Sequence, residues 1–214
     1  MKRILLIGGT GFSGKQVLKE LLKQGYLVTA ITRNANSIEI RDDKLKVAEG
    51  NVLNPLFIER IIENQDAVVN CLGIGGKGDG KPNTLLSDST KILVDVMENS
   101  RTKRLIAMSN VGAGDSKNFH PFLFRKLILP YFMKWLQVII DDKNRMEPIV
   151  MDSQLEWTLV RCPNITDKPA KNNVYATLDG EGLKLSITNA DLATFLVEQL
   201  NDNQYIRKAP SVSN

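Results

Sequence analysis

Residues 2–14, KRILLIGGTGFSG, decide the fold of this 214-residue chain. Residues 4–7 form an uninterrupted apolar run, which has the length of a buried parallel strand and is too short to span a membrane. Three evenly spaced glycines follow the run: Gly8, Gly11 and Gly14. Residues 15–24 then place apolar side chains on one helical face and charged ones on the other, and Gly25 stands at a typical helix-capping position. The stretch therefore predicts a strand, a glycine turn and a helix.

This order of elements is the one that a nucleotide-binding motif requires. Glycines let the backbone turn tightly and approach a pyrophosphate, and the free N–H groups at the start of the helix hold the anion. The spacing is G-x-x-G-x-x-G, and no Lys-Ser/Thr pair follows the last glycine, which argues against a P-loop. The alternative is a glycine-rich turn that binds nothing, but the flanking strand and helix favour the binding motif.

The composition suits a single domain, because 214 residues that are 43% hydrophobic can build one sizeable core. No segment has the length of a membrane span, and Gly8 and Gly9 interrupt the N-terminal apolar run before it can resemble a signal peptide. Cys71 and Cys162 lie in apolar stretches, which favours a reducing compartment, and we expect a cytoplasmic protein. With His120 as the sole histidine, the sequence offers no metal-ligand spacing.

The charge pattern indicates no nucleic-acid partner. The net charge of +4 is mild, and the basic residues are scattered among acidic ones. An anionic cofactor accounts for some of the positive excess.

Strand-like and helix-like segments alternate along the rest of the chain. Strands are predicted at residues 27–32, 45–48, 67–72, 104–108, 157–162 and 183–187, and helices at 55–62, 89–100, 141–152 and from 189 or 191. This alternation predicts an α/β fold, a Rossmann-like doubly wound parallel sheet in which residues 1–214 form one domain with a small C-terminal lobe on the substrate side. The ligand should lie over the carboxyl ends of the strands, where the first and fourth strands meet.

The end of the second predicted strand indicates which dinucleotide binds. Arg33 stands there, about 20 residues past the glycines, where an acid would hold a ribose 2′-hydroxyl and an arginine favours a 2′-phosphate. No Asp or Glu occupies the strand end, so we predict NADP(H). The alternative is a surface arginine without a ligand.

Two other segments leave alternatives open. Residues 73–81 are rich in glycine and could lie against the cofactor or form a plain flexible loop. Residues 119–140 are unusually apolar, and Pro130 interrupts them, so we expect two short helices rather than a membrane span. This insertion could be a wall of a substrate pocket, a surface for a protein partner or for self-association, or a packed flap.

Several motifs resemble those of the atypical and extended short-chain dehydrogenases. GGTGFSG, residues 8–14, looks like their cofactor motif, and GNVLNP, residues 50–55, resembles their G-D-V-x-D-P segment with Asn51 in place of the usual acid. Residues 141–169 resemble the biliverdin-IXβ reductase and flavin reductase family, and they are similar to NAD(P)H-binding proteins of the NmrA-like subgroup. The resemblance covers essentially the whole chain.

The resemblance implies a role for each part of the predicted cofactor site. The pyrophosphate would be held by Gly8, Thr10, Gly11, Phe12, Ser13 and Gly14. Arg33 would meet the 2′-phosphate, and the adenine would lie against Asn51 and Val52. The ribose would lie along Cys71, Leu72 and Gly73, and the nicotinamide beside Pro163, Asn164 and Ile165.

The resemblance also implies where the chemistry would take place. Short-chain dehydrogenases use Tyr-x-x-x-Lys, in which the lysine lowers the tyrosine pKa so that the tyrosine can transfer a proton. The nearest approach here is Tyr131-x-x-Lys134, one residue short. The serine that the family carries at the end of the fifth strand is Ser109 or Asn110, and Lys143 stands where the biliverdin-IXβ reductase family has a histidine. We predict that these three residues line the acceptor site.

Two functions of different classes fit this sequence. One is an NADPH-dependent reductase that transfers hydride to a flavin, quinone or tetrapyrrole-like acceptor. Such an acceptor can take its proton from water, so the protein mainly supplies orientation and an electrostatic setting. The other is a non-catalytic NADP(H) sensor, as in some NmrA-like proteins, that acts through a protein partner.

Overall fold

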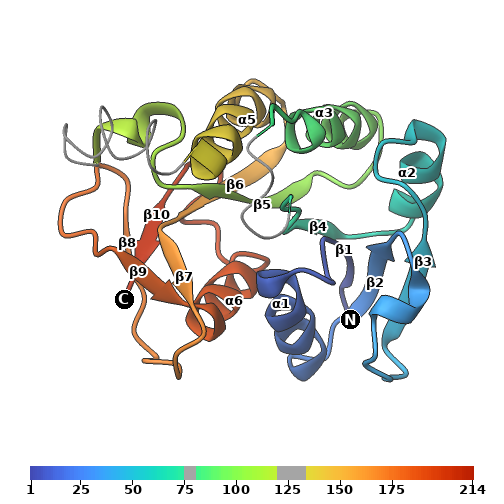
Figure 1. Cartoon of the computed structure of the whole chain (residues 1–214). Helices are drawn as coiled ribbons and strands as arrows, with labels where there is room; N and C mark the ends of the chain where they lie inside the picture. Colours follow the sequence, from blue (N-terminus) through green and yellow to red (C-terminus); the bar gives the residue numbers. More distant parts are fainter. Residues whose placement is uncertain (75–80, 120–133) are drawn as a thin grey trace.

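The computed structural model describes residues 1–74, 81–119 and 134–214. In these residues eight strands form one sheet in the order β3-β2-β1-β4-β5-β6-β10-β8, and only the β10–β8 pair is antiparallel (Figure 1). The six strands that carry the site are β1 (Arg3–Ile7), β2 (Leu27–Thr32), β3 (Leu45–Glu49), β4 (Ala67–Asn70), β5 (Arg104–Asn110) and β6 (Glu156–Cys162). The predicted α/β class with a doubly wound parallel sheet is confirmed.

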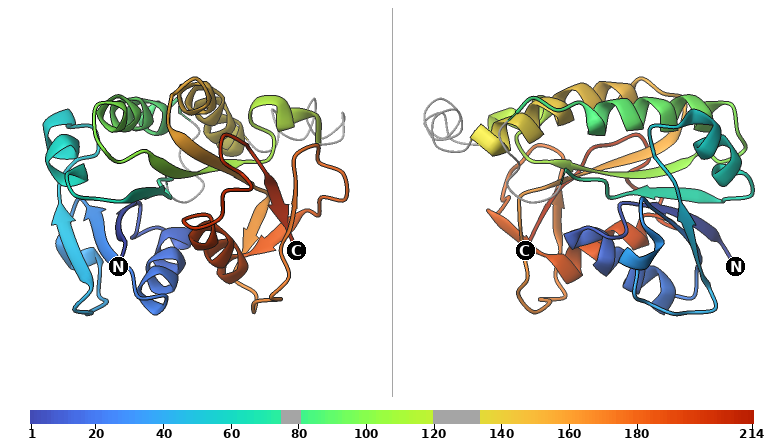
Figure 2. Two further views of the ribbon diagram at one scale, coloured as in Figure 1. Left: turned by 180° about the vertical axis from the view of Figure 1, so that it is seen from behind. Right: turned by 45° about the vertical axis from the view of Figure 1, so that its right-hand side comes forward.

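Helices cover both faces of the sheet (Figures 1 and 2). One face is covered by α1 (Phe12–Lys23) and α6 (Asn189–Glu198), the other by α2 (Pro55–Ile62), α3 (Leu85–Glu98) and α5 (Lys134–Met151). None of the helices in the described ranges is long and apolar enough to cross a membrane.

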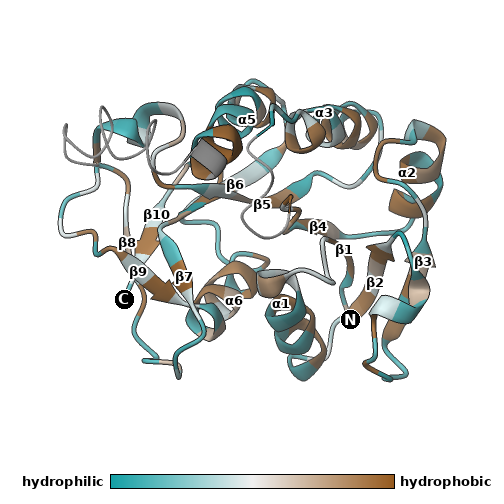
Figure 3. Ribbon diagram, viewed as in Figure 1, coloured by the Kyte–Doolittle hydropathy of each residue, from teal (hydrophilic) through white to brown (hydrophobic). Residues whose placement is uncertain are grey.

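The two helical layers explain why the first strand is an unbroken apolar run. Ile4 and Leu6 belong to the buried cluster on the α1 and α6 face, whereas Leu5 and Ile7 belong to the cluster on the opposite face. Successive side chains of a strand point to opposite sides of the sheet, so a strand between two helical layers needs apolar residues at every position. Figure 3 shows most of β1 as hydrophobic, while α1 carries both hydrophobic and hydrophilic sides.

The order in which successive strands are added to the sheet reverses at β1, and this reversal determines where the ligand site lies. β1 pairs in parallel with β2 on one side and with β4 on the other, so that Ile7 stands between Ile31 and Asn70. The chain continues from β2 to β3 toward one edge and from β4 through β5 to β6 toward the other. The loops after β1 and β4 therefore leave room between them, which is the position that the sequence predicts for the ligand.

Helix α3 begins at Leu85, four residues before the predicted start at residue 89. Two of its N-terminal N–H groups are satisfied by a distant carboxylate, because Asp142 of α5 accepts hydrogen bonds from Leu86 N at 2.8 Å and from Ser87 N at 3.3 Å. This part of the cap comes from another helix and leaves no signal in the local sequence. A local signal was also missed, because Asn83 Oδ1 accepts a hydrogen bond from Leu85 N at 2.7 Å.

The apolar insertion at residues 119–140 falls largely outside the described residues. Its first residue ends the short 3₁₀ helix η2 (Gly114–Phe119), and residues 134–140 are the first two turns of α5. The helix predicted at 141–152 is therefore the second part of a longer helix. The two short helices are predicted within 119–140, and residues 120–133 of that range, which include Tyr131, lie outside the described residues.

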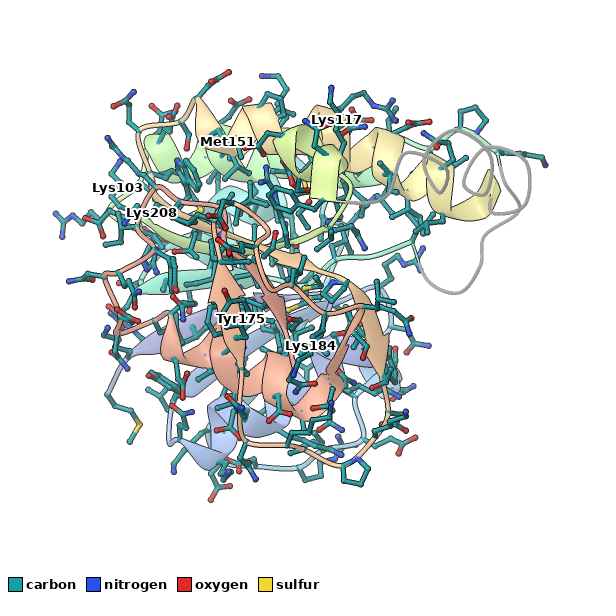
Figure 4. The ribbon with its side chains drawn as sticks, turned by 90° about the vertical axis from the view of Figure 1, so that its left-hand side faces the viewer. Lys103, Lys117, Met151, Tyr175, Lys184 and Lys208 are labelled. Carbon is teal, nitrogen blue, oxygen red and sulfur yellow. The ribbon has the colours of Figure 1, made fainter. Side chains whose placement is uncertain are left out.

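Four short strands follow β6 near the C-terminus, and we refer to this segment as the C-terminal lobe, although two of the four also extend the eight-stranded sheet. β7 (Asn164–Thr166) pairs with β9 (Ser186–Thr188), and β8 (Tyr175–Thr177) pairs with β10 (Ser211–Ser213). Figure 4 shows Tyr175 and Lys184 on this lobe. The sequence predicts a strand only at 183–187 here, since strands of three residues are too short to show a periodic pattern.

Candidate functional site

A cleft of about 780 Å³ lies over the carboxyl ends of the central strands. This volume is within the range of cofactor and small-molecule sites. All but three of the predicted site residues line it, and those that do are Gly8, Thr10, Gly11, Phe12, Ser13, Arg33, Asn51, Val52, Cys71, Leu72, Gly73, Ser109, Asn110, Lys143 and Ile165. The three that do not are Gly14, Pro163 and Asn164.

Gly8 and Gly14 shape the turn between β1 and α1. Gly8 has a φ of +81°, and a Cβ there would stand 2.6 Å from the backbone oxygen of Cys71, at the end of the neighbouring strand. A Cβ on Gly14 would collide with the backbone oxygen of Gly8. The resemblance implies that Gly14 holds the pyrophosphate, but it lies behind the turn and allows α1 to approach it closely. Both positions therefore require glycine for steric reasons.

The start of α1 has the features of an anion-binding site. Gly11 is the N-cap residue and offers no side-chain cap, and the first turn carries no acidic residue. The helix dipole and the free N–H groups of this turn face the cleft, where they suit a pyrophosphate. Asn189 of α6 fixes the turn from behind, because its Nδ2 donates to the Phe12 oxygen at 3.0 Å.

Arg33 is exposed at the end of β2, on the wall of the cleft. It forms no ion pair with any residue in the described part of the chain. Glu49, which pairs with Thr32 at the end of the neighbouring strand β3, accepts a hydrogen bond from Ala35 N at 2.8 Å and does not line the cleft. The guanidinium is therefore available to a phosphate.

The opposite end of the cleft brings β5 and α5 together. Ser109 is 2% exposed, and its hydroxyl has no hydrogen-bond partner among the residues that the structure describes. Asn110 is half-buried beside it. Lys143 of α5 reaches the same strand end, where its Nζ donates to the Met108 oxygen at 2.6 Å. A buried hydroxyl without a partner on the wall of a cleft is suited to bind a ligand group.

Burial lowers the pKa of Lys143 from 10.5 to about 8, although Asp142 and Glu147 on the same helix counteract the shift. Cys71 and Cys162 also lie within its electrostatic range. Burial raises the pKa of each of these thiols to about 12, so both are neutral near pH 7. The lysine therefore stands among groups that do not neutralise its charge directly.

The two carboxylates near Lys143 are engaged elsewhere. Asp142 caps α3 and also accepts from Arg145 at 3.3 Å. Glu147 forms a buried two-bond pair with Arg161, with Nη2 to Oε2 at 2.6 Å and Nε to Oε1 at 3.1 Å. Both acids hold the framework of α5 rather than the ligand site.

The cleft also contains residues that sequence reasoning missed. The most informative is Ile139, which lies one helical turn before Lys143 on α5 and lines the same cleft. The spacing Ile139-x-x-x-Lys143 is a signal that could have found it. The others are Ile31, Thr32, Gly50, Leu53, Ile74, Asn83, Leu85, Leu86, Met108 and Cys162.

The predicted nicotinamide wall is only partly present. Ile165 lines the cleft, but Pro163 and Asn164 do not. The Asn164 N–H instead donates to the Leu185 oxygen at 3.2 Å, within the C-terminal lobe. This segment turns into the short strand β7, which the sequence did not predict. Tyr131 lies outside the described residues, as does the side chain of Lys134.

Comparison with known proteins agrees with this geometry. Residues 8–203 match the family model of NAD(P)H-binding proteins. The chain is 24% identical over 213 residues to the uncharacterized protein YwnB of Bacillus subtilis, a match that covers 95% of this chain and 94% of that protein. It is 27% identical over 218 residues to the divinyl chlorophyllide a 8-vinyl-reductase of Arabidopsis thaliana. That match covers 91% of this chain and 49% of the reductase, so the chain spans about half the length of this relative.

Solved structures share the fold. One is a short-chain dehydrogenase/reductase from Veillonella parvula in complex with NADP, with a TM-score of 0.78 and 17% identity over 100% of this chain and 94% of that one. Another is ChuY, an anaerobilin reductase from Escherichia coli O157:H7, with a TM-score of 0.78 and 17% identity over 99% and 97% of the two chains. The family match confirms the resemblance indicated by residues 8–14. This chain therefore belongs to the family of NAD(P)H-binding proteins, and NAD(P)H is its cofactor.

Proposed function

We propose that this protein is an NADPH-dependent reductase that transfers hydride to a flavin, quinone or tetrapyrrole-like acceptor. The observation that carries the proposal is a single cleft with groups suited to a dinucleotide phosphate at one end and polar groups suited to an acceptor at the other. At one end lie the start of α1, without a side-chain cap, and Arg33, which forms no ion pair within the described ranges, and at the other lie Ser109 and Lys143. Bound NADPH supplies the hydride.

The residues of the chain bind and orient the reactants. The N–H groups at the start of α1 hold the pyrophosphate, and Arg33 favours a 2′-phosphate over a 2′-hydroxyl. The Ser109 hydroxyl, unpartnered in the described residues, hydrogen-bonds the nicotinamide or the acceptor, and Asn110 lies beside it. Positioning of this kind can remove several kcal/mol from a barrier, roughly 7–11 kcal/mol in the best intramolecular cases.

A flat, conjugated acceptor suits the walls of the acceptor end. Ile139, Leu86 and Met108 are apolar, and the neutral thiol of Cys162 lies nearby. Apolar walls with few polar groups bind the face of a ring system while leaving its edge to those groups. The names of the chlorophyllide and anaerobilin reductases support the inclusion of tetrapyrrole-like acceptors.

A steady-state assay tests the proposal directly. The protein is mixed with NADPH or NADH and with FMN, menadione or biliverdin, and the loss of reduced nicotinamide is followed. We expect turnover with at least one acceptor and a lower KM for NADPH than for NADH. Tight NADPH binding without turnover of any acceptor would contradict a reductase and would instead support an NADP(H) sensor that acts through a protein partner.

A further inference from the structure

Three cleft residues repeat the arrangement of a short-chain dehydrogenase with one replacement. Ser109 stands at the end of β5, and Ile139 and Lys143 follow on α5, four residues apart. Residues at i and i+4 share one face of a helix, and both of these line the cleft. The spacing is that of Tyr-x-x-x-Lys, with Ile139 at the position of the tyrosine. Among the residues that the structure describes, the cleft therefore has the serine and the lysine of this arrangement, with Ile139 rather than a phenol four residues before the lysine.

We propose that Lys143 itself donates the proton that accompanies hydride transfer, in place of the tyrosine that Ile139 replaces. This inference rests on the proposed reductase function and names the proton donor within the same site. It differs from the expectation that the acceptor takes its proton from water.

The surroundings of Lys143 support this role. Its Nζ is anchored by the bond to the Met108 oxygen at 2.6 Å and lies 3.5 Å from the Met146 sulfur, which leaves a third N–H without a partner among the described residues. The lysine is 5% exposed, so bulk water has little access to it, yet it lines the cleft. An ammonium group held in this way can direct an N–H toward an acceptor bound between α5 and β5.

The charged and titratable groups around the ammonium leave it able to lose a proton. Asp142 and Glu147 from α5, Cys162 from β6 and Cys71 from the end of β4 are the groups that act on it. Asp142 and Glu147 are bound to α3 and to Arg161, and the two thiols are neutral. The pKa of about 8 keeps Lys143 mostly protonated at pH 7 and makes it a much better donor than an ordinary lysine.

Hydride addition to the acceptor is accompanied by transfer of one proton from Lys143. Hydride addition to one atom of a conjugated double bond forms a new bond to hydrogen and leaves the former π electron pair on the conjugated partner atom. One N–H bond of the Lys143 ammonium breaks, the proton bonds to that anionic atom, and the electron pair stays on Nζ. Water then returns a proton to the neutral amine. The acceptor gains two electrons and two hydrogens, and NADPH is oxidised to NADP⁺.

The test compares Lys143→Met and Lys143→Arg with the wild type. Methionine removes the proton, while arginine keeps a charge that does not dissociate in the working pH range. Lys19→Met, at an exposed position of α1, is the matched control. Three quantities are measured: kcat with the best acceptor between pH 6 and pH 10, NADPH binding by calorimetry, and the titration of the Lys143 side chain by NMR with isotope-labelled lysine.

We expect both Lys143 variants to lose roughly 10²–10⁴-fold in kcat, as is typical when a general acid is removed. NADPH affinity should change less than about threefold. In the wild type, kcat should fall above pH 8 in parallel with the NMR titration of Lys143, whose resonance is identified by its absence from Lys143→Met.

Two results would overturn the inference. If both variants keep wild-type kcat, or if kcat does not follow the titration of Lys143, water supplies the proton and the reductase function remains. If the wild type binds NADPH but reduces no acceptor, the proposed function and the inference both fail.

Discussion

Arg33 is the residue on which the choice between NADPH and NADH rests. Arg33→Ala should weaken NADPH binding by about tenfold to a hundredfold, because a charge-assisted hydrogen bond is worth about 1.5–3 kcal/mol. NADH binding should stay nearly unchanged, since NADH carries no 2′-phosphate. Calorimetry with both nucleotides measures the preference, and Arg101→Ala, at an exposed turn outside the cleft, serves as the control. An unchanged preference would show that the 2′-phosphate lies elsewhere.

Gly8 and Gly73 form a matched pair in the same cleft. Gly8→Ala should destabilise the protein by roughly 2–4 kcal/mol, through the left-handed φ and the contact with the Cys71 oxygen, and it should weaken nucleotide binding. A Cβ at Gly73 meets nothing within 4 Å, so Gly73→Ala should change stability little. Urea denaturation compares the two variants. Equal losses of stability would mean that the turn adapts to a side chain.

The pH dependence of stability should reveal the buried Lys143. Its pKa falls from 10.5 in the unfolded chain to about 8 in the folded protein, so the unfolded chain holds the additional proton between these values. The resulting penalty is complete below pH 8 and disappears as the pH rises toward 10.5. Lys143→Met should therefore raise the free energy of unfolding at pH 7, with a gain over wild type that shrinks across this window. A constant difference from pH 7 to pH 10.5 would contradict the lowered pKa.

At the scale of the element, α5 connects the ligand site to the fold. Asp142 caps α3 from this helix, so Asp142→Ala should leave the N–H groups of Leu86 and Ser87 without their acceptor. We expect a loss of about 1–3 kcal/mol in the free energy of unfolding, with little change in NADPH affinity. Asp141→Ala is the control, because Asp141 is exposed and bonds only to the side chain of Gln137 among the described residues. Similar losses for the two variants would refute the capping role.

The helices and strands differ in how well they could be predicted from the sequence. Most of the strands β1 to β6 could be predicted because they are rich in apolar residues in a layer covered on both faces, and β2 matches its predicted bounds. The edge strand β3, with the sequence LKVAE, shows only part of this pattern. The start of α3 was predicted four residues too late, since its caps at Leu86 and Ser87 come from Asp142, more than fifty residues away, and only Asn83 marks it locally. The motif Tyr-x-x-x-Lys could not point to Ile139, which is not a tyrosine, whereas the structure shows that Ile139 and Lys143 line the same cleft one helical turn apart.

At the scale of the whole molecule, the site belongs to no single element. The glycine turn, Arg33, Ser109 and Lys143 come from four separate parts of the chain, and the parallel sheet brings them to one edge. The sequence could predict most of these residues because a motif or a strand end marks each one. It could not predict that Pro163 and Asn164 lie outside the cleft lining, since the Asn164 N–H bonds to Leu185 in a lobe built from three-residue strands.

Anaerobic mixing of the NADPH-bound protein with an excess of FMN, menadione or biliverdin tests the reductase function most directly. The absorbance of reduced nicotinamide is followed through repeated additions of NADPH. The proposed function predicts that bound NADPH is oxidised over many turnovers with at least one acceptor, and that Ser109→Ala and Lys143→Met slow the oxidation while NADPH still binds. Bound NADPH that stays reduced with all three acceptors would contradict it.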